Sequence, residues 1–121
     1  MRASKLAAFA ALAGAAVPGQ AQTPDPAPVS DEQSYQEAME CKVRVEALDA
    51  VSRDSQDRKR LGSALAYWVE KERAAGAMLG KNAGAMLADE TIFGFAESSN
   101  PESFRRAMAC AEQASADSAD R

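Results

Sequence analysis

Apolar residues recur at intervals of three and four along most of the chain after residue 30, which is the period of helices with one buried face. Ser30 and Gln33 match a capping box at the start of the first such segment. The pattern therefore predicts a first helix over residues 31–51. Its apolar stripe comprises Tyr35, Ala38, Met39, Cys41, Val45 and Leu48.

A second, longer helix is predicted over residues 55–79. Asp54 and Asp57 lie at its start, where the helix dipole favours negative charge. Glu72 interrupts its apolar stripe, whereas Trp68 fits the stripe and is therefore assigned to the core. The stripe comprises Leu61, Ala64, Leu65, Trp68, Val69 and Gly76.

The next stretch, residues 75–87, reads AGAMLGKNAGAML and places Gly76, Gly80 and Gly84 four residues apart. We expect a joint here, in which Gly80 ends the long helix and Asn82 caps a short third helix over residues 83–88. The alternative is one continuous helix whose glycine face lets other helices approach closely. A position for Gly80 in the middle of a helix would favour that alternative.

The C-terminal third begins ambiguously, because residues 89–99 fit either a helix or a packed loop. We expect Ile92, Phe93 and Phe95 to be buried in both cases. Asn100, Pro101 and Glu102 then give a clear helix start, so a last helix is predicted over residues 101–115. Its core stripe comprises Phe104, Ala107, Met108 and Ala111. We expect residues 116–121 to form a disordered tail.

The N-terminal residues have a different pattern. Arg2 and Lys5 precede an apolar run over residues 6–17, and small residues follow at positions 19 and 21. This order is typical of a secretory signal peptide, so we expect cleavage after Ala21 and a periplasmic or secreted protein. The run is shorter than the roughly 20 residues that a membrane span needs. We therefore expect no transmembrane span in the mature chain.

Residues 22–30 contain three prolines, which disfavour helices and central strands, and we interpret them as a linker. The folded domain is then expected over residues 31–115. Its two cysteines, Cys41 and Cys110, lie in the first and last predicted helices. An even pair in an exported chain favours a disulfide. Together these features predict an all-α fold, a small bundle of about four helices stapled by one disulfide.

Composition narrows the chemistry. The chain has no histidine, which excludes Ser–His, Cys–His and His-based zinc sites. Glu70 and Glu72, like Asp89 and Glu90, are too close in sequence for both members of a pair to share one helix face. We therefore expect no catalytic, cofactor or metal site. Without the predicted leader, 12 basic and 18 acidic residues give a net charge of −6, which disfavours nucleic-acid binding.

The main functional hypothesis is an exported, non-enzymatic helical module that binds a protein partner in the bacterial cell envelope. Its candidate partner surface consists of three groups of residues. Arg58, Lys59 and Arg60 form a basic cluster that could dock an acidic partner, although a solvated face balanced by the neighbouring aspartates is the favoured interpretation. Tyr67 lies off the core stripe, and Met78 lies at the glycine-rich joint.

Two alternatives remain open at this point. The layout of a small, exported, helical chain with two helix-bridging cysteines resembles periplasmic chaperones of the acid-stress type. That resemblance implies a bundle that loosens at low pH as its carboxylates become protonated. The other alternative is self-assembly through the face of Gly76, Gly80 and Gly84.

Overall fold

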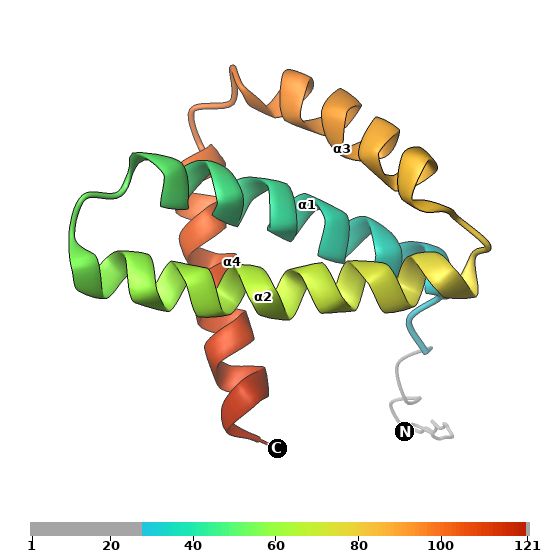
Figure 1. The fold of residues 1–121 in the computed structure, drawn as a ribbon, viewed down its shortest axis with the longest axis horizontal. Coiled ribbons are helices and arrows are strands. Elements are labelled where there is room, and N and C mark those ends of the chain that lie inside the picture. The colour runs from blue at the N-terminus through green and yellow to red at the C-terminus, as the bar shows by residue number, and fades with distance from the viewer. Residues whose placement is uncertain (1–27, 121) are drawn as a thin grey trace, which may run out of the picture.

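A computed structural model describes residues 28–120, and within them the chain is all-α, as predicted. The predicted signal peptide and most of the linker lie outside the described residues. Four helices follow one another, and they are labelled in Figure 1. They are α1 (Asp31–Val51), α2 (Ser55–Met78), α3 (Ala83–Glu97) and α4 (Ser103–Ala119).

Three of these helices start where a side chain caps the backbone. Ser30 and Gln33 form the predicted capping box of α1, with Ser30 Oγ accepting from the Gln33 N–H at 3.1 Å. Asp54 accepts from the Asp57 N–H at 3.0 Å, and Asn82 accepts from the Ala85 N–H at 2.8 Å. These bonds satisfy N–H groups that have no partner within the helix.

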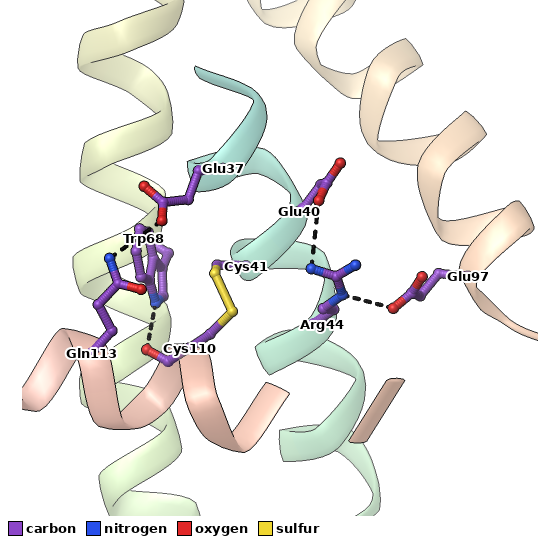
Figure 2. Close-up of a disulfide and its surroundings, with 8 residues drawn as sticks. All are labelled: Glu37, Glu40, Cys41, Arg44, Trp68, Glu97, Cys110 and Gln113. Carbon is purple, nitrogen blue, oxygen red and sulfur yellow. Dashed lines mark hydrogen bonds and ion pairs between the residues drawn. A yellow bond between two sulfur atoms is a disulfide. The ribbon is translucent and has the colours of Figure 1, made fainter. Parts of the chain in front are cut away.

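Helices α1 and α2 form an antiparallel hairpin, and α4 crosses both of them on one side (Figure 1). Small residues on α4 allow this close crossing, because Ala107 and Ala111 are completely buried against the hairpin. Trp68 on α2 lies in the same core, and its indole N–H donates to the carbonyl of Cys110 at 3.0 Å (Figure 2). The core is thus built from α1, α2 and α4.

The predicted disulfide is present and joins α1 to α4. The Cα atoms of Cys41 and Cys110 lie 5.5 Å apart, within the usual range for this bond. The bond closes a loop of 69 residues between helices that already pack together. It therefore staples the first helix to the last, as the sequence predicted.

The glycine-rich stretch forms a joint between two helices, as predicted. Helix α2 ends at Met78, and Gly80 adopts a left-handed φ of 71°, which glycine reaches without strain. Gly76 is buried against Tyr35 and Met86, whereas Gly84 belongs to the next helix. The three glycines therefore share no helix face, and the hypothesis of assembly through them loses its structural basis.

Helix boundaries in the C-terminal third differ from the predicted ones. Helix α3 continues past residue 88 to Glu97, so the ambiguous segment is mostly helical. Helix α4 starts at Ser103, because Pro101 and Glu102 form a turn in which the Glu102 N–H donates to the Asn100 side chain at 2.9 Å. Helix α4 also extends to Ala119, well into the expected tail.

Several burial predictions are wrong, most of them because apolar side chains expected in the core are exposed. Side chains expected in the core lie on the surface, with exposed fractions of 71% for Ile92, 84% for Phe95 and 49% for Phe104. Val69 is also exposed. In the opposite sense, Glu72 is buried with 4% of its surface exposed, although it interrupts the apolar stripe of α2. Most of these differences trace to how α3 sits on the bundle.

The disulfide leads to a first prediction. Replacing Cys41 and Cys110 together by alanine should lower the free energy of unfolding by up to about 4 kcal/mol, because the unfolded chain regains the entropy of an open loop. Urea unfolding followed by the fluorescence of the single tryptophan, Trp68, measures the change. A reductant should destabilise the wild type equally and leave the double variant unchanged. Equal stability of both proteins would contradict the prediction.

Candidate functional site

Helix α3 is seated on the bundle by its acidic side. Asp89, Glu90 and Glu97 turn toward α1, together with the half-buried Phe93. The opposite side is apolar and exposed. Its large side chains have exposed fractions of 63% for Leu87, 71% for Ile92 and 84% for Phe95. A surface helix usually buries its apolar side and exposes its charged side, whereas α3 does the opposite.

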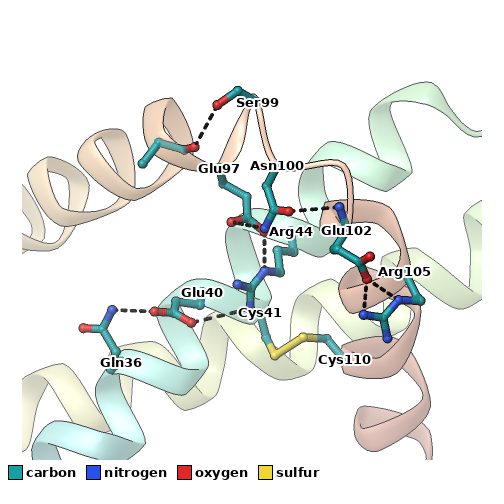
Figure 3. A network of polar contacts seen from close by, with 11 residues as sticks. Gln36, Glu40, Cys41, Arg44, Glu97, Ser99, Asn100, Glu102, Arg105 and Cys110 are labelled. Carbon is teal, nitrogen blue, oxygen red and sulfur yellow. Dashed lines mark hydrogen bonds and ion pairs between the residues drawn. A yellow bond between two sulfur atoms is a disulfide. The ribbon is translucent and has the colours of Figure 1, made fainter.

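Arg44 of α1 holds the C-terminal end of α3. Its Nε donates to Glu97 at 2.6 Å, and its Nη1 lies 3.5 Å from Glu40 (Figure 3). Its guanidinium also lies 5.0 Å from the centre of the Phe93 ring, a cation–π distance. Glu97 accepts a second hydrogen bond from Asn100 at 3.2 Å. Arg44 therefore supplies the opposite charge for Glu97, the most buried acid of α3.

The N-terminal half of α3 is held by a second group of polar contacts. The Tyr35 hydroxyl donates to Asp89 at 2.7 Å, and Lys81 forms an ion pair with the same carboxylate at 3.0 Å. The Lys81 ammonium lies 5.0 Å from the centre of the Tyr35 ring. These contacts join α1, the joint and α3 around one carboxylate.

A third group lies between α1, α2 and α3. Lys42 Nζ donates to Glu90 at 2.7 Å and lies 3.6 Å from Glu72. The side chains of Glu72 and Glu90 are 5% and 14% exposed. Two largely buried carboxyl groups therefore face a single lysine. The two members of each acid pair noted in the sequence do point in different directions, as expected. The fold nevertheless brings Glu72 of the first pair and Glu90 of the second pair together at Lys42.

These surroundings shift the pKa values in two directions. Hydrogen bonds from Tyr35 and Lys81 lower the pKa of Asp89. Burial opposes ionisation of Glu97, but its bonds from Arg44 and Asn100 outweigh burial and lower its pKa. Burial and the neighbouring Glu90 instead raise the pKa of Glu72 to about 7. The acids that seat α3 thus respond differently to pH.

Two grooves flank α3, which forms one wall of each. One groove has a volume of about 720 Å³ and lies over the first half of α1; the other, of about 650 Å³, lies over its second half. Tyr35, Met39 and Phe93 are among the residues that line the first groove. Val43 and Phe104 are among those that line the second. The exposed side of α3 and these two grooves form the candidate site, which we call the α3 surface.

The structure does not unite the five residues of the predicted partner surface. Arg58, Lys59 and Arg60 are exposed near the start of α2, and Met78 is 70% exposed at its end, about 30 Å farther along a helix of this length. The prediction that Tyr67 lies on the surface is wrong. It is 9% exposed, packs edge-on against Trp68 at 4.8 Å and donates a hydrogen bond to Asp117.

Sequence reasoning missed the exposed apolar residues of α3, although a signal was present. On a helical projection of 100° per residue, Asp89, Glu90 and Glu97 fall on one side, and Leu87, Ile92 and Phe95 fall on the other. The acidic and the apolar side of the helix can therefore be distinguished from the sequence. The rule that a surface helix buries its apolar side nevertheless selects the wrong side of α3, because the rule does not consider the cations of α1.

Other chemistry receives no support from the described part of the chain. Residues 28–120 contain no cluster of three or more potential ligands arranged to hold a metal ion. Among the four helices, none combines the length and apolar character that crossing a membrane requires. No protein family, curated protein or solved structure matches this chain.

The acidic contacts of α3 predict how stability depends on pH. Because the folded protein holds the pKa values of Asp89 and Glu97 below their ordinary values, these groups stabilise the fold above about pH 4.5. That stabilisation is lost as the pH falls through the lowered values. Glu97→Gln should cost about 2 kcal/mol at neutral pH and reduce the loss of stability in acid.

Urea unfolding at neutral pH and near pH 3 measures both effects. Glu112→Gln, on the exposed side of α4, is the matched control and should behave like the wild type. An acid dependence as steep in Glu97→Gln as in the wild type would show that Glu97 does not contribute to it.

Proposed function

We propose that this protein is an exported, non-enzymatic helical module that binds other proteins through the α3 surface. The observation that carries the proposal is the exposure of Leu87, Ile92 and Phe95 on one uncharged helix side. Contiguous exposed apolar side chains of this size are typical of protein interaction sites. A disulfide between buried cysteines is typical of exported proteins.

The chemistry of the partner follows from what surrounds the α3 surface. Exposed acids line both grooves, Glu32 in the first and Glu46 in the second, and the chain carries a net negative charge. A polypeptide segment with apolar side chains flanked by lysine or arginine would complement this pattern. Apolar contact would supply most of the affinity, and the charges would orient the segment and speed association.

The proposal is tested with a double variant, Ile92→Ser with Phe95→Ser. Both side chains are exposed, so the fold should remain stable, while binding should weaken about tenfold or more. The probe is a synthetic amphipathic peptide of leucine and lysine, and its affinity is measured by calorimetry. A peptide with glutamate in place of lysine should bind less tightly.

Val69→Ser is the matched control, because Val69 is also apolar and exposed but lies on α2. It should bind the lysine peptide like the wild type. The same three proteins can then be used to capture partners from a cell-envelope extract. A partner retained equally by all three, or equal peptide affinity of the double variant, would contradict binding through the α3 surface.

A second candidate function, an acid-stress-type chaperone, is favoured by one observation. The contacts that seat α3 depend on ionised Asp89, Glu90 and Glu97, which become protonated in strong acid. Loss of these charges would free α3 and expose the apolar groove floors beneath it. The disulfide would meanwhile keep α1 and α4 joined.

This candidate predicts that residues 83–97 lose hydrogen-exchange protection near pH 2–3, where carboxylates are protonated. It also predicts that the protein suppresses aggregation of an unfolded client there and not at neutral pH. Light scattering of an acid-unfolded test protein measures the second effect. If α3 stays protected near pH 2–3, the chaperone function fails, whereas peptide binding at neutral pH is unaffected.

A further inference from the structure

A buried polar cluster lies under α3 and is not used by the binding surface itself. Glu72 of α2 is its centre, because this side chain is almost completely buried and its Oε2 atom accepts no hydrogen bond when the carboxyl group is ionised. Lys42 of α1 lies 3.6 Å from Glu72 and 2.7 Å from Glu90 of α3, and Glu90 also interacts with Glu72. The cluster therefore joins three helices.

The charges of the cluster do not balance if both acids are ionised. Lys42 supplies one positive charge to two carboxylates, and its contact with Glu90 is the shorter, 2.7 Å against 3.6 Å for Glu72. A buried, uncompensated carboxylate with an unpaired oxygen is costly. One added proton removes the excess charge and gives Glu72 a hydrogen to donate to Glu90.

The other charged groups around the cluster do not supply a second cation. From α1, Tyr35 contributes a neutral hydroxyl that is bonded to Asp89, and Glu46 adds a further negative charge near Lys42. Lys81 lies at the joint and is paired with Asp89 of α3. The net charge of the cluster of Lys42, Glu72 and Glu90 therefore stays negative until one of its carboxylates takes up a proton.

We propose that Glu72 and Glu90 share one proton, carried by Glu72, and that this proton fastens α3 to the bundle. Loss of the proton in mildly alkaline solution leaves two facing carboxylates, and their repulsion loosens α3. The pH thus regulates the seating of the helix that bears the α3 surface. This regulation bears on the proposed binding function, but its test needs no partner.

The assignment of the proton to Glu72 rests on burial and geometry. Glu72 is the more buried of the two acids, whereas Glu90 has the closer contact with Lys42. Burial and Glu90 raise the pKa of Glu72 to about 7. Burial alone would raise the pKa of Glu90 as well, but hydrogen bonds from Glu72 and Lys42 outweigh it and lower that pKa.

The sign of the effect follows from linkage. The seated state binds the proton more tightly than a state with α3 detached, in which Glu72 regains an ordinary pKa. The contribution of this proton to seating is therefore fully present below the ordinary pKa of a glutamate and is lost as the pH rises through about 7. Between about pH 6 and 8 the equilibrium for seating should fall roughly tenfold.

Amide hydrogen exchange of residues 83–97 tests the proposal in the full mature chain. After correction for intrinsic rates, protection in the wild type should be about tenfold lower near pH 8 than near pH 6. Glu72→Gln imitates the protonated acid, so its α3 should stay protected across this range. Glu70→Gln, on the exposed side of the same helix, is the matched control and should behave like the wild type.

Carbon-13 detection of the glutamate carboxyl groups gives an independent measurement in the unmodified protein. One glutamate, absent from the spectrum of Glu72→Gln, should titrate with a midpoint near 7. A Glu72 midpoint below about 5 would overturn the proposal, and so would α3 protection that is independent of pH in the wild type. Ile92→Ser with Phe95→Ser should keep the pH response even if it abolishes binding, which separates this test from that of the proposed function.

Discussion

The position of α1 is the constraint on which the rest of the structure depends. Cys41, on one side of this helix, is bonded to α4, and the adjacent Cys110 carbonyl accepts from Trp68 of α2. These contacts fix α1 in the middle of the domain. Lys42 and Arg44 follow closely after Cys41 in the chain, and the long side chains of both reach acids of α3. Figure 2 shows Arg44 extending away from the disulfide toward Glu97. The helix that the disulfide fixes thus also supplies the two cations that hold α3.

The orientation of α3 follows from those two cations. A helix with three acids on one side and large apolar residues on the other can bury only one side against α1. Burying the apolar side would remove the closer partner of each cation and leave Lys42 only Glu72 and Arg44 only Glu40, whereas burying the acidic side adds Glu90 and Glu97. The cost is an apolar side in water. A protein tolerates such exposure most readily where a partner covers it, and this reasoning connects the polar seating of α3 with the proposed binding function.

Seating through charges also makes α3 adjustable without unfolding the domain. The core of α1, α2 and α4 is mostly apolar and is closed by a disulfide, so its packing depends far less on ionised side chains than the seating of α3 does. The contacts of α3 are ion pairs and hydrogen bonds whose strength changes as carboxyl groups gain or lose protons. Acids with lowered pKa values favour seating above strongly acidic pH, and Glu72 favours it below mildly alkaline pH. Their combination gives α3 a preferred range of pH.

The sequence by itself determined the all-α class, the first two helices, the joint at Gly80 and the disulfide. These features depend on local rules, namely helical periodicity, capping side chains, glycine conformation and cysteine pairing. Tertiary structure decided which side of α3 is buried, why Glu72 lies inside an otherwise apolar stripe and why Tyr67 is covered. The physical reason is that the cost of burying a charge depends on the partner it meets. For the acids of α3, those partners are Lys42 and Arg44, which are supplied by another helix more than 40 residues away in sequence.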